Sequence, residues 1–88
     1  MRYIVKKNSA KMKKFKKIFD SHAINVYRIC LFILRDEEKA EEIAESVFVY
    51  FYEHMEEVRP EMVLAHLVVE ARNKSHEYKK SMEPRMEE

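Results

Sequence analysis

The sequence has no glycine and only two prolines, so it is poor in the residues that tight turns between β-strands require. A single cysteine, Cys30, excludes an internal disulfide and favours a protein of the reducing cytoplasm. No apolar run approaches the roughly 18–20 residues that cross a bilayer, and the N-terminus has no signal-peptide pattern, so we expect no membrane partner. With 88 residues, the chain makes one small domain.

Residues suited to catalysis or metal binding are scarce or badly spaced. Four histidines and Cys30 show none of the close pairs that bind zinc. There is no glycine-rich phosphate loop, and no nucleophile stands beside an obvious base. Cys30 itself lies in an apolar row and fits a core position. We therefore expect no catalytic residue, no metal site and no cofactor, and the chain is not predicted to be an enzyme.

What the sequence does contain is three stretches of helical periodicity. They predict helices over residues 9–34, 36–57 and 60–80, with Asp36 capping the second helix and Pro60 in the first turn of the third. Because the links between these helices are short, the predicted fold class is all-α, with three long antiparallel helices in a bundle.

Apolar residues recur every three or four positions and predict which side of each helix faces the core. The first helix has the row Met12, Phe15, Phe19, Ala23, Val26, Cys30 and Ile33, widened by Ile18, Ile29 and Phe32. The second has Ala40, Ile43, Ala44, Val47, Phe48, Phe51 and Met55. The third has Leu64, Val68, Ala71, Ser75 and Tyr78, with Val63 and Leu67 alongside. Outside the helical domain of residues 9–80, we expect an extended or frayed lead-in over 1–8 and a disordered tail over 81–88.

Charge is segregated along the chain although the net charge is only +1. Residues 1–17 carry eight Lys or Arg and no acid, whereas residues 36–57 carry nine acids and one Lys. Residues 59–80 are mildly basic, with five bases against three acids. The sequence therefore predicts a basic arm, an acidic middle helix and a third helix with a basic outward face.

Three motifs in order resemble a known family over about residues 12–80. The first helix carries Phe15, Ile18, Phe19, Asp20, Val26, Tyr27, Arg28, Ile29 and Leu34. The second carries Asp36, Ala40, Glu41, Glu42, Ile43, Glu45, Ser46, Val47, Phe48 and Tyr52. The third carries Val63, Ala65, Leu67, Ala71, Arg72, Asn73, Glu77 and Lys80. At these separations the chain resembles the second conserved region of bacterial sigma factors, above all the extracytoplasmic-function group.

The resemblance implies two binding roles for this region. The middle helix of the family docks on the clamp helices of the β′ subunit of core RNA polymerase. The third helix recognises the promoter −10 element and captures its single-stranded non-template strand. The polymerase contacts implied here are Glu41, Glu42, Glu45 and Tyr52. The DNA contacts implied here are Arg72, Asn73, His76, Lys79 and Lys80.

Departures from the family pattern keep a second interpretation open. The family's glutamine and the acid after it are Glu45 and Ser46, and positions that are often basic in the third helix are Leu64 and Val69. Because the thinned basic face weakens the case for DNA binding, the alternative is a sigma-like protein-interaction module. That module is half of a split sigma factor with a partner chain bearing region 4, or a decoy for an anti-sigma factor. A third interpretation is an unrelated helical bundle.

Aromatic residues are dense on the middle helix. Phe48, Tyr50, Phe51 and Tyr52 point to two helical faces, so a three-helix unit does not bury them all. Exposed aromatic side chains are common anchors of protein interfaces. The cluster therefore predicts that part of this helix meets a partner protein.

Overall fold

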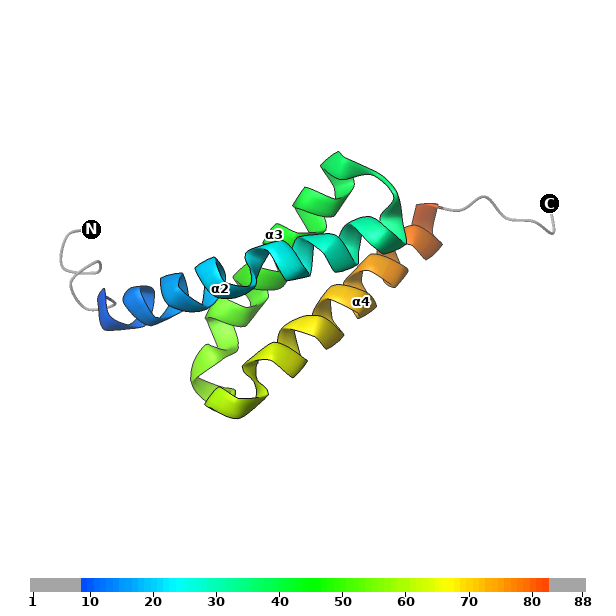
Figure 1. Ribbon diagram of the computed structural model, residues 1–88. Coiled ribbons are helices and arrows are strands. Elements are labelled where there is room, and N and C mark those ends of the chain that lie inside the picture. Colours follow the sequence, from blue (N-terminus) through cyan, green and yellow to red (C-terminus); the bar gives the residue numbers. More distant parts are fainter. Residues whose placement is uncertain (1–8, 83–88) are drawn as a thin grey trace.

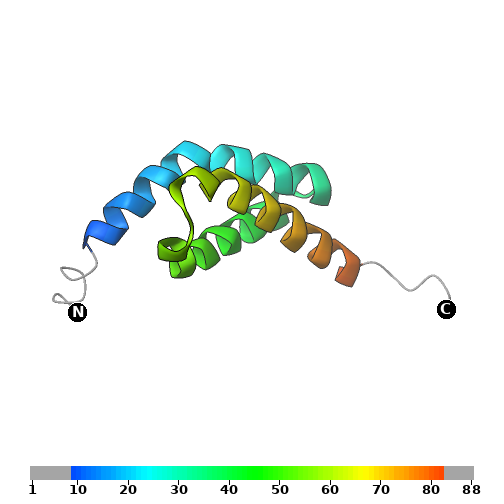
Figure 2. The same ribbon diagram turned by 90° about the horizontal axis from the view of Figure 1, so that it is seen from below.

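The computed structural model describes residues 9–82, and all the regular structure in this part of the chain is helical. Helix α2 spans Ser9–Leu34, α3 spans Glu37–His54 and α4 spans Val63–Met82. Two 3-10 turns, η1 (Met55–Glu57) and η2 (Pro60–Met62), lie between α3 and α4. Successive helices run in opposite directions (Figures 1 and 2). The predicted all-α bundle of three antiparallel helices is confirmed.

The second and third helices differ from their predicted bounds where they approach each other. The α-helical part of α3 ends at His54, and the residues predicted to continue it form η1. Helix α4 begins at Val63 and not at Pro60, because Pro60–Met62, predicted as its first turn, form η2. Two tight backbone bonds hold this connection, from Val58 N–H to Met55 O (3.2 Å) and from Met62 N–H to Arg59 O (2.8 Å).

The ends of the helical domain also need a correction. Helix α4 continues to Met82, so residues 81 and 82, which were predicted to belong to the tail, are helical. The expected lead-in over residues 1–8 and the rest of the expected tail, residues 83–88, lie outside the described residues.

The chain reverses between α2 and α3 without a glycine. Arg35 takes the left-handed conformation with φ of 57°, and its backbone N–H donates to Leu31 O at 2.8 Å. Asp36 then begins the next helix, because its carboxylate accepts a bond from Lys39 N–H at 3.0 Å. The cap predicted at Asp36 is confirmed.

The core lies where the three helices meet. The fully buried side chains there include Val26 and Cys30 from α2, Val47 and Phe51 from α3, and Leu67 from α4. The whole predicted apolar row of α3 is buried or half-buried. Burial of these side chains, at about 25 cal/mol for each Å² of apolar surface, is the main force that holds the helices together.

The predicted core rows of α2 and α4 are only partly correct. Met12, Phe19 and Phe32 of α2 are exposed, as is Leu64 of α4, whereas Leu67 is fully buried. A broad apolar stripe packs only along the part that its neighbours cover, and this depends on how the helices cross. None of the helices in the described residues is long and apolar enough to span a bilayer.

Candidate protein-binding groove and nucleic-acid face

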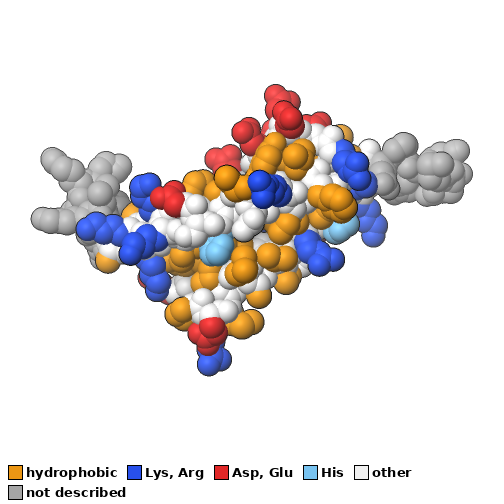
Figure 3. Space-filling model, viewed as in Figure 1, with side chains coloured by type: hydrophobic (Ala, Val, Ile, Leu, Met, Phe, Trp, Pro, Cys, Tyr) orange, Lys and Arg blue, Asp and Glu red, His pale blue; other side chains and the backbone are white. Residues whose placement is uncertain are grey.

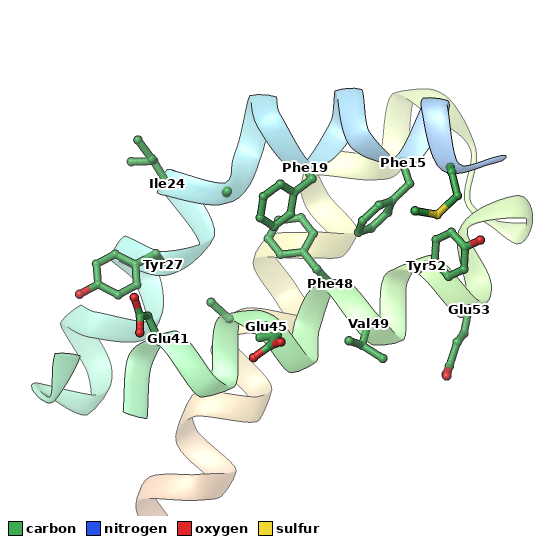
Figure 4. A pocket seen from close by; sticks show the side chains of 13 residues that line it. Phe15, Phe19, Ile24, Tyr27, Glu41, Glu45, Phe48, Val49, Tyr52 and Glu53 are labelled. Atoms are coloured by element: carbon green, nitrogen blue, oxygen red, sulfur yellow. The ribbon is translucent and has the colours of Figure 1, made fainter. Parts of the chain in front are cut away.

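A groove with a volume of about 810 Å³ lies between α2 and α3 (Figure 4). Phe19 and Phe48 lie between the two helices with their ring centres 4.8 Å apart. Tyr52 lies at one end of the groove, and Tyr27 lies beside Glu41 at the other. The groove is therefore an elongated channel with a largely apolar floor.

Aromatic contacts hold the two walls of the groove in place. The Phe15 ring of α2 meets Tyr52 of α3 edge-on, with 5.2 Å between the ring centres. The Lys11 ammonium lies 4.3 Å from the centre of the Tyr52 ring, which is a cation–π distance. Tyr52 is thus half-buried in a fixed position, and its remaining surface faces the groove.

Some apolar side chains along the groove are exposed and not buried in the core. Ile24 of α2 is 65% exposed and Val49 of α3 is 53% exposed. Single exposed apolar residues are ordinary, but a contiguous apolar surface in a hollow marks an interaction site. The groove therefore has the character of a binding surface for an apolar partner.

Acidic side chains line the α3 side of this groove. Glu41, Glu45 and Glu53 follow one another at intervals of four or eight residues, so they share one side of the helix. Desolvation, followed by the carboxylates of Glu37 and Glu41, raises the pKa of Tyr27, so its hydroxyl stays protonated. The groove thus combines an apolar floor with negative charge on one wall.

The structure brings together three of the four predicted polymerase contacts. Glu41, Glu45 and Tyr52 all line the groove, whereas Glu42 does not. Glu42 lies 3.7 Å from the Lys39 ammonium, whose pKa is raised first by Tyr78 and then by Glu42. The negative charge of Glu42 is therefore partly neutralised by Lys39.

Sequence reasoning missed Glu53, Ile24 and Val49 as groove residues. The four-residue spacing from Glu45 would have indicated Val49 and Glu53. Nothing in the sequence would have indicated Ile24, because its role depends on the gap between two helices.

A second hollow, of about 400 Å³, lies between the C-terminal half of α2 and the middle of α4. Its lining residues are Arg28, Ile29, Phe32, Ile33, Arg72 and His76. In Figure 3, acidic side chains gather at the edges of the visible face, and basic and hydrophobic side chains lie side by side between them. The two predicted DNA contacts Arg72 and His76 thus meet residues of α2 that the sequence had not connected with them.

The other predicted DNA contacts are exposed on α4. Asn73 follows Arg72, and Lys79 and Lys80 lie in the last turns of the helix. None of these three lines the hollow. They extend the polar surface of α4 toward its C-terminal end.

Two buried side chains with polar atoms, Cys30 and Ser75, lie in the core. Cys30 is fully buried, and burial raises the pKa of its thiol, which keeps it protonated. The neighbouring Ser75 hydroxyl of α4 acts in the opposite direction on the pKa of the thiol, with a smaller effect than burial. Within residues 9–82, no three His, Cys, Asp or Glu side chains are grouped so as to hold a metal ion. The prediction that Cys30 is a core residue is confirmed.

No protein-family model, curated protein or solved structure matches this chain. The resemblance to sigma factors therefore rests on the residues and spacings of the three helical motifs.

Proposed function

We propose that this chain is a module of the sigma region 2 type, which binds the β′ clamp helices of core RNA polymerase and contributes to recognition of the promoter −10 element. The observation that carries the proposal is the position of Glu41, Glu45 and Tyr52. The resemblance implies four polymerase contacts, and these three of them line one groove with exposed apolar side chains. A family resemblance and a physical binding surface thus point to the same part of α3.

The chemistry of the groove suits a helical partner with basic side chains. Apolar groups of such a helix would cover Val49 and Ile24, and its Lys or Arg side chains would meet Glu41 and Glu45. Complementary charge raises the association rate and fixes the register of the two partners. Burial of the apolar floor supplies most of the affinity.

The DNA-binding part of the proposal rests on α4. Arg72, His76, Lys79 and Lys80 are exposed and available to phosphates, and Asn73 carries a side-chain amide suited to hydrogen bonding. The phosphate contacts would hold the single-stranded non-template strand, and the Asn73 amide would supply hydrogen bonds to base edges for recognition of the −10 element. These residues of α4 support the proposed function less strongly than the groove does.

A specific observation favours the alternative, a sigma-like interaction module with weak or no DNA binding. Leu64 and Val69, at positions that are often basic in the family, are 47% and 52% exposed. In the connection before α4, Arg59 is paired with Glu61 at 3.3 Å, which reduces its attraction for phosphate. The partner would then be an anti-sigma factor or a chain bearing region 4.

The test is capture of purified core polymerase by the whole chain. Reversing Glu41 and Glu45 to Lys should abolish capture, because both acids line the groove. The matched control reverses Glu56 and Glu57, which are also exposed and neighbouring acids but lie outside the groove. Each variant changes the net charge equally and should keep its helical circular dichroism.

Each result has a clear meaning. Capture that the groove variant loses and the control variant keeps supports polymerase binding through this surface. Equal loss in both variants would show that only overall charge matters. No capture by the folded wild-type chain would contradict the polymerase proposal and favour the interaction-module alternative.

A further inference from the structure

Phe32 is the most exposed large hydrophobic residue in the described part of the chain, at 73%. It stands at the edge of the hollow between α2 and α4, with Ile29 and Ile33 of the same helix beside it. An exposed phenylalanine alone would be unremarkable on a protein surface. Its surroundings are what distinguish it.

Those surroundings are basic, with no acidic residue in the lining. Arg28, Arg72 and His76 line the hollow with Phe32, and both arginines are exposed. Within residues 9–82, the ion pairs are Lys16–Asp20, Lys39–Glu42 and Arg59–Glu61. Neither arginine of the hollow thus has a carboxylate partner in this part of the chain.

Arg35 adds a further cation beside the ring. Its guanidinium carbon lies 5.4 Å from the centre of the Phe32 ring, and its Nε donates to Phe32 O at 2.9 Å. This bond holds the guanidinium near the ring, yet most of the Phe32 side chain remains exposed. A flat aromatic surface is therefore presented among several cations.

We propose that this hollow binds single-stranded nucleic acid, with one base stacked on Phe32 and the adjacent phosphates held by Arg28 and Arg72. Aromatic rings next to basic side chains bind single strands, because bases stack on the ring while cations hold the backbone. A volume of about 400 Å³ is at the small end of ligand sites, which are roughly 300–1,000 Å³, and suits a single nucleotide.

This inference rests on the proposed DNA role of α4 and extends that site onto α2. The resemblance gives no binding role to Arg28 or Phe32. A duplex would hide the base faces that the ring can reach, and an acidic peptide would use the cations without needing the ring. Single-stranded nucleic acid uses both features of the hollow.

The test measures fluorescence anisotropy of a labelled single-stranded oligothymidine of about 12 nucleotides, since single-strand sites span roughly 4–16 nucleotides. Replacing Phe32 by Leu should weaken binding about tenfold, because stacking is lost while an apolar side chain remains. The control Met62→Leu replaces another apolar side chain, which is 50% exposed and lies outside both hollows. It should bind the oligonucleotide like the wild-type chain.

Salt dependence separates the role of the ring from that of the cations. Arg28→Ala should make the slope of log affinity against log salt shallower by about 0.7, as expected for one lost phosphate contact on a single strand. Phe32→Leu should leave that slope unchanged. Lys13→Ala, an exposed cation outside the hollow, should change neither slope nor affinity by a comparable amount.

Several outcomes would overturn the inference. If Phe32→Leu binds like the wild-type chain while reversal of Lys79 and Lys80 to Glu abolishes binding, the DNA role of α4 stands and the site on α2 is wrong. If the wild-type chain binds an acidic peptide or anionic vesicles and not the oligonucleotide, both DNA sites are wrong. Polymerase capture through Glu41 and Glu45 is measured separately and is unaffected by either result.

Discussion

The groove between α2 and α3 and the hollow between α2 and α4 lie on two sides of one helix, yet they differ in charge and in the core near them. The first is lined by acids and floored by aromatic rings such as Phe48. The second is lined by cations, and the buried residues nearby include the small side chains Cys30 and Ser75. A chain with a net charge of only +1 thus presents two chemically opposite surfaces.

The difference shows what a wide apolar stripe does in a three-helix unit. Helix α2 has more apolar surface than α3 and α4 cover, and the excess emerges on both sides, at Ile24 and Phe32. The charge of each neighbouring helix then gives each exposed edge its character. The charges that are separated along the sequence are therefore also separated in space, with acids along the groove and cations along the hollow.

The largest effect is expected in the buried core, which holds the helices of both surfaces in place. Phe51 is fully buried and contacts Phe15 with 6.4 Å between ring centres. Phe51→Ala should lower the free energy of unfolding by about 3–5 kcal/mol, a large part of the stability of a small domain. A denaturant titration measures this loss of stability. Binding of polymerase and binding of the oligonucleotide should both fall in the variant. Phe32→Ala, the exposed counterpart, should change stability by less than about 0.5 kcal/mol, and a similar loss in both variants would contradict the structure.

A smaller effect, on polymerase binding, should distinguish two acids that lie three residues apart on α3. Glu45→Lys should weaken polymerase binding about tenfold, mainly through slower association, because Glu45 lines the groove. Glu42→Lys should weaken it much less, because Glu42 lies outside the groove and is paired with Lys39. Interferometry on immobilised core polymerase gives both rates. Equal losses would mean that the binding surface is wider than the groove.

A smaller change still is expected near the basic hollow. Ser75 is fully buried, and its hydroxyl has no hydrogen-bond partner within the described residues. Ser75→Ala should therefore be neutral or stabilise the chain by up to about 1 kcal/mol, because an unpaired polar group is removed and alanine favours the helix. Thermal unfolding measures this change. A loss above about 1 kcal/mol would show that the hydroxyl is bonded after all.

The sequence was sufficient for the features that depend on neighbouring residues in the chain. Helical periodicity predicted three helices and the buried row of α3, and the Asp36 cap follows from local chemistry. It was insufficient for features set by how helices cross, such as the exposure of Phe32 and Leu64, which were both predicted to face the core. The meeting of Arg28 with Arg72 depends on contact between α2 and α4, which no local pattern contains.

The smallest effect concerns Arg35, the residue at which the chain reverses between α2 and α3. Its left-handed conformation, with φ of 57°, costs about 1–2 kcal/mol in a residue with a side chain, and Arg35→Gly would remove that cost. The same change loses the bond from Nε to Phe32 O, worth about 0.5–1.5 kcal/mol, and adds freedom to the unfolded chain. These contributions nearly cancel, so the unfolding free energy should change by less than about 0.5 kcal/mol. A gain above about 1 kcal/mol would show that the side-chain bond to Phe32 contributes nothing to stability.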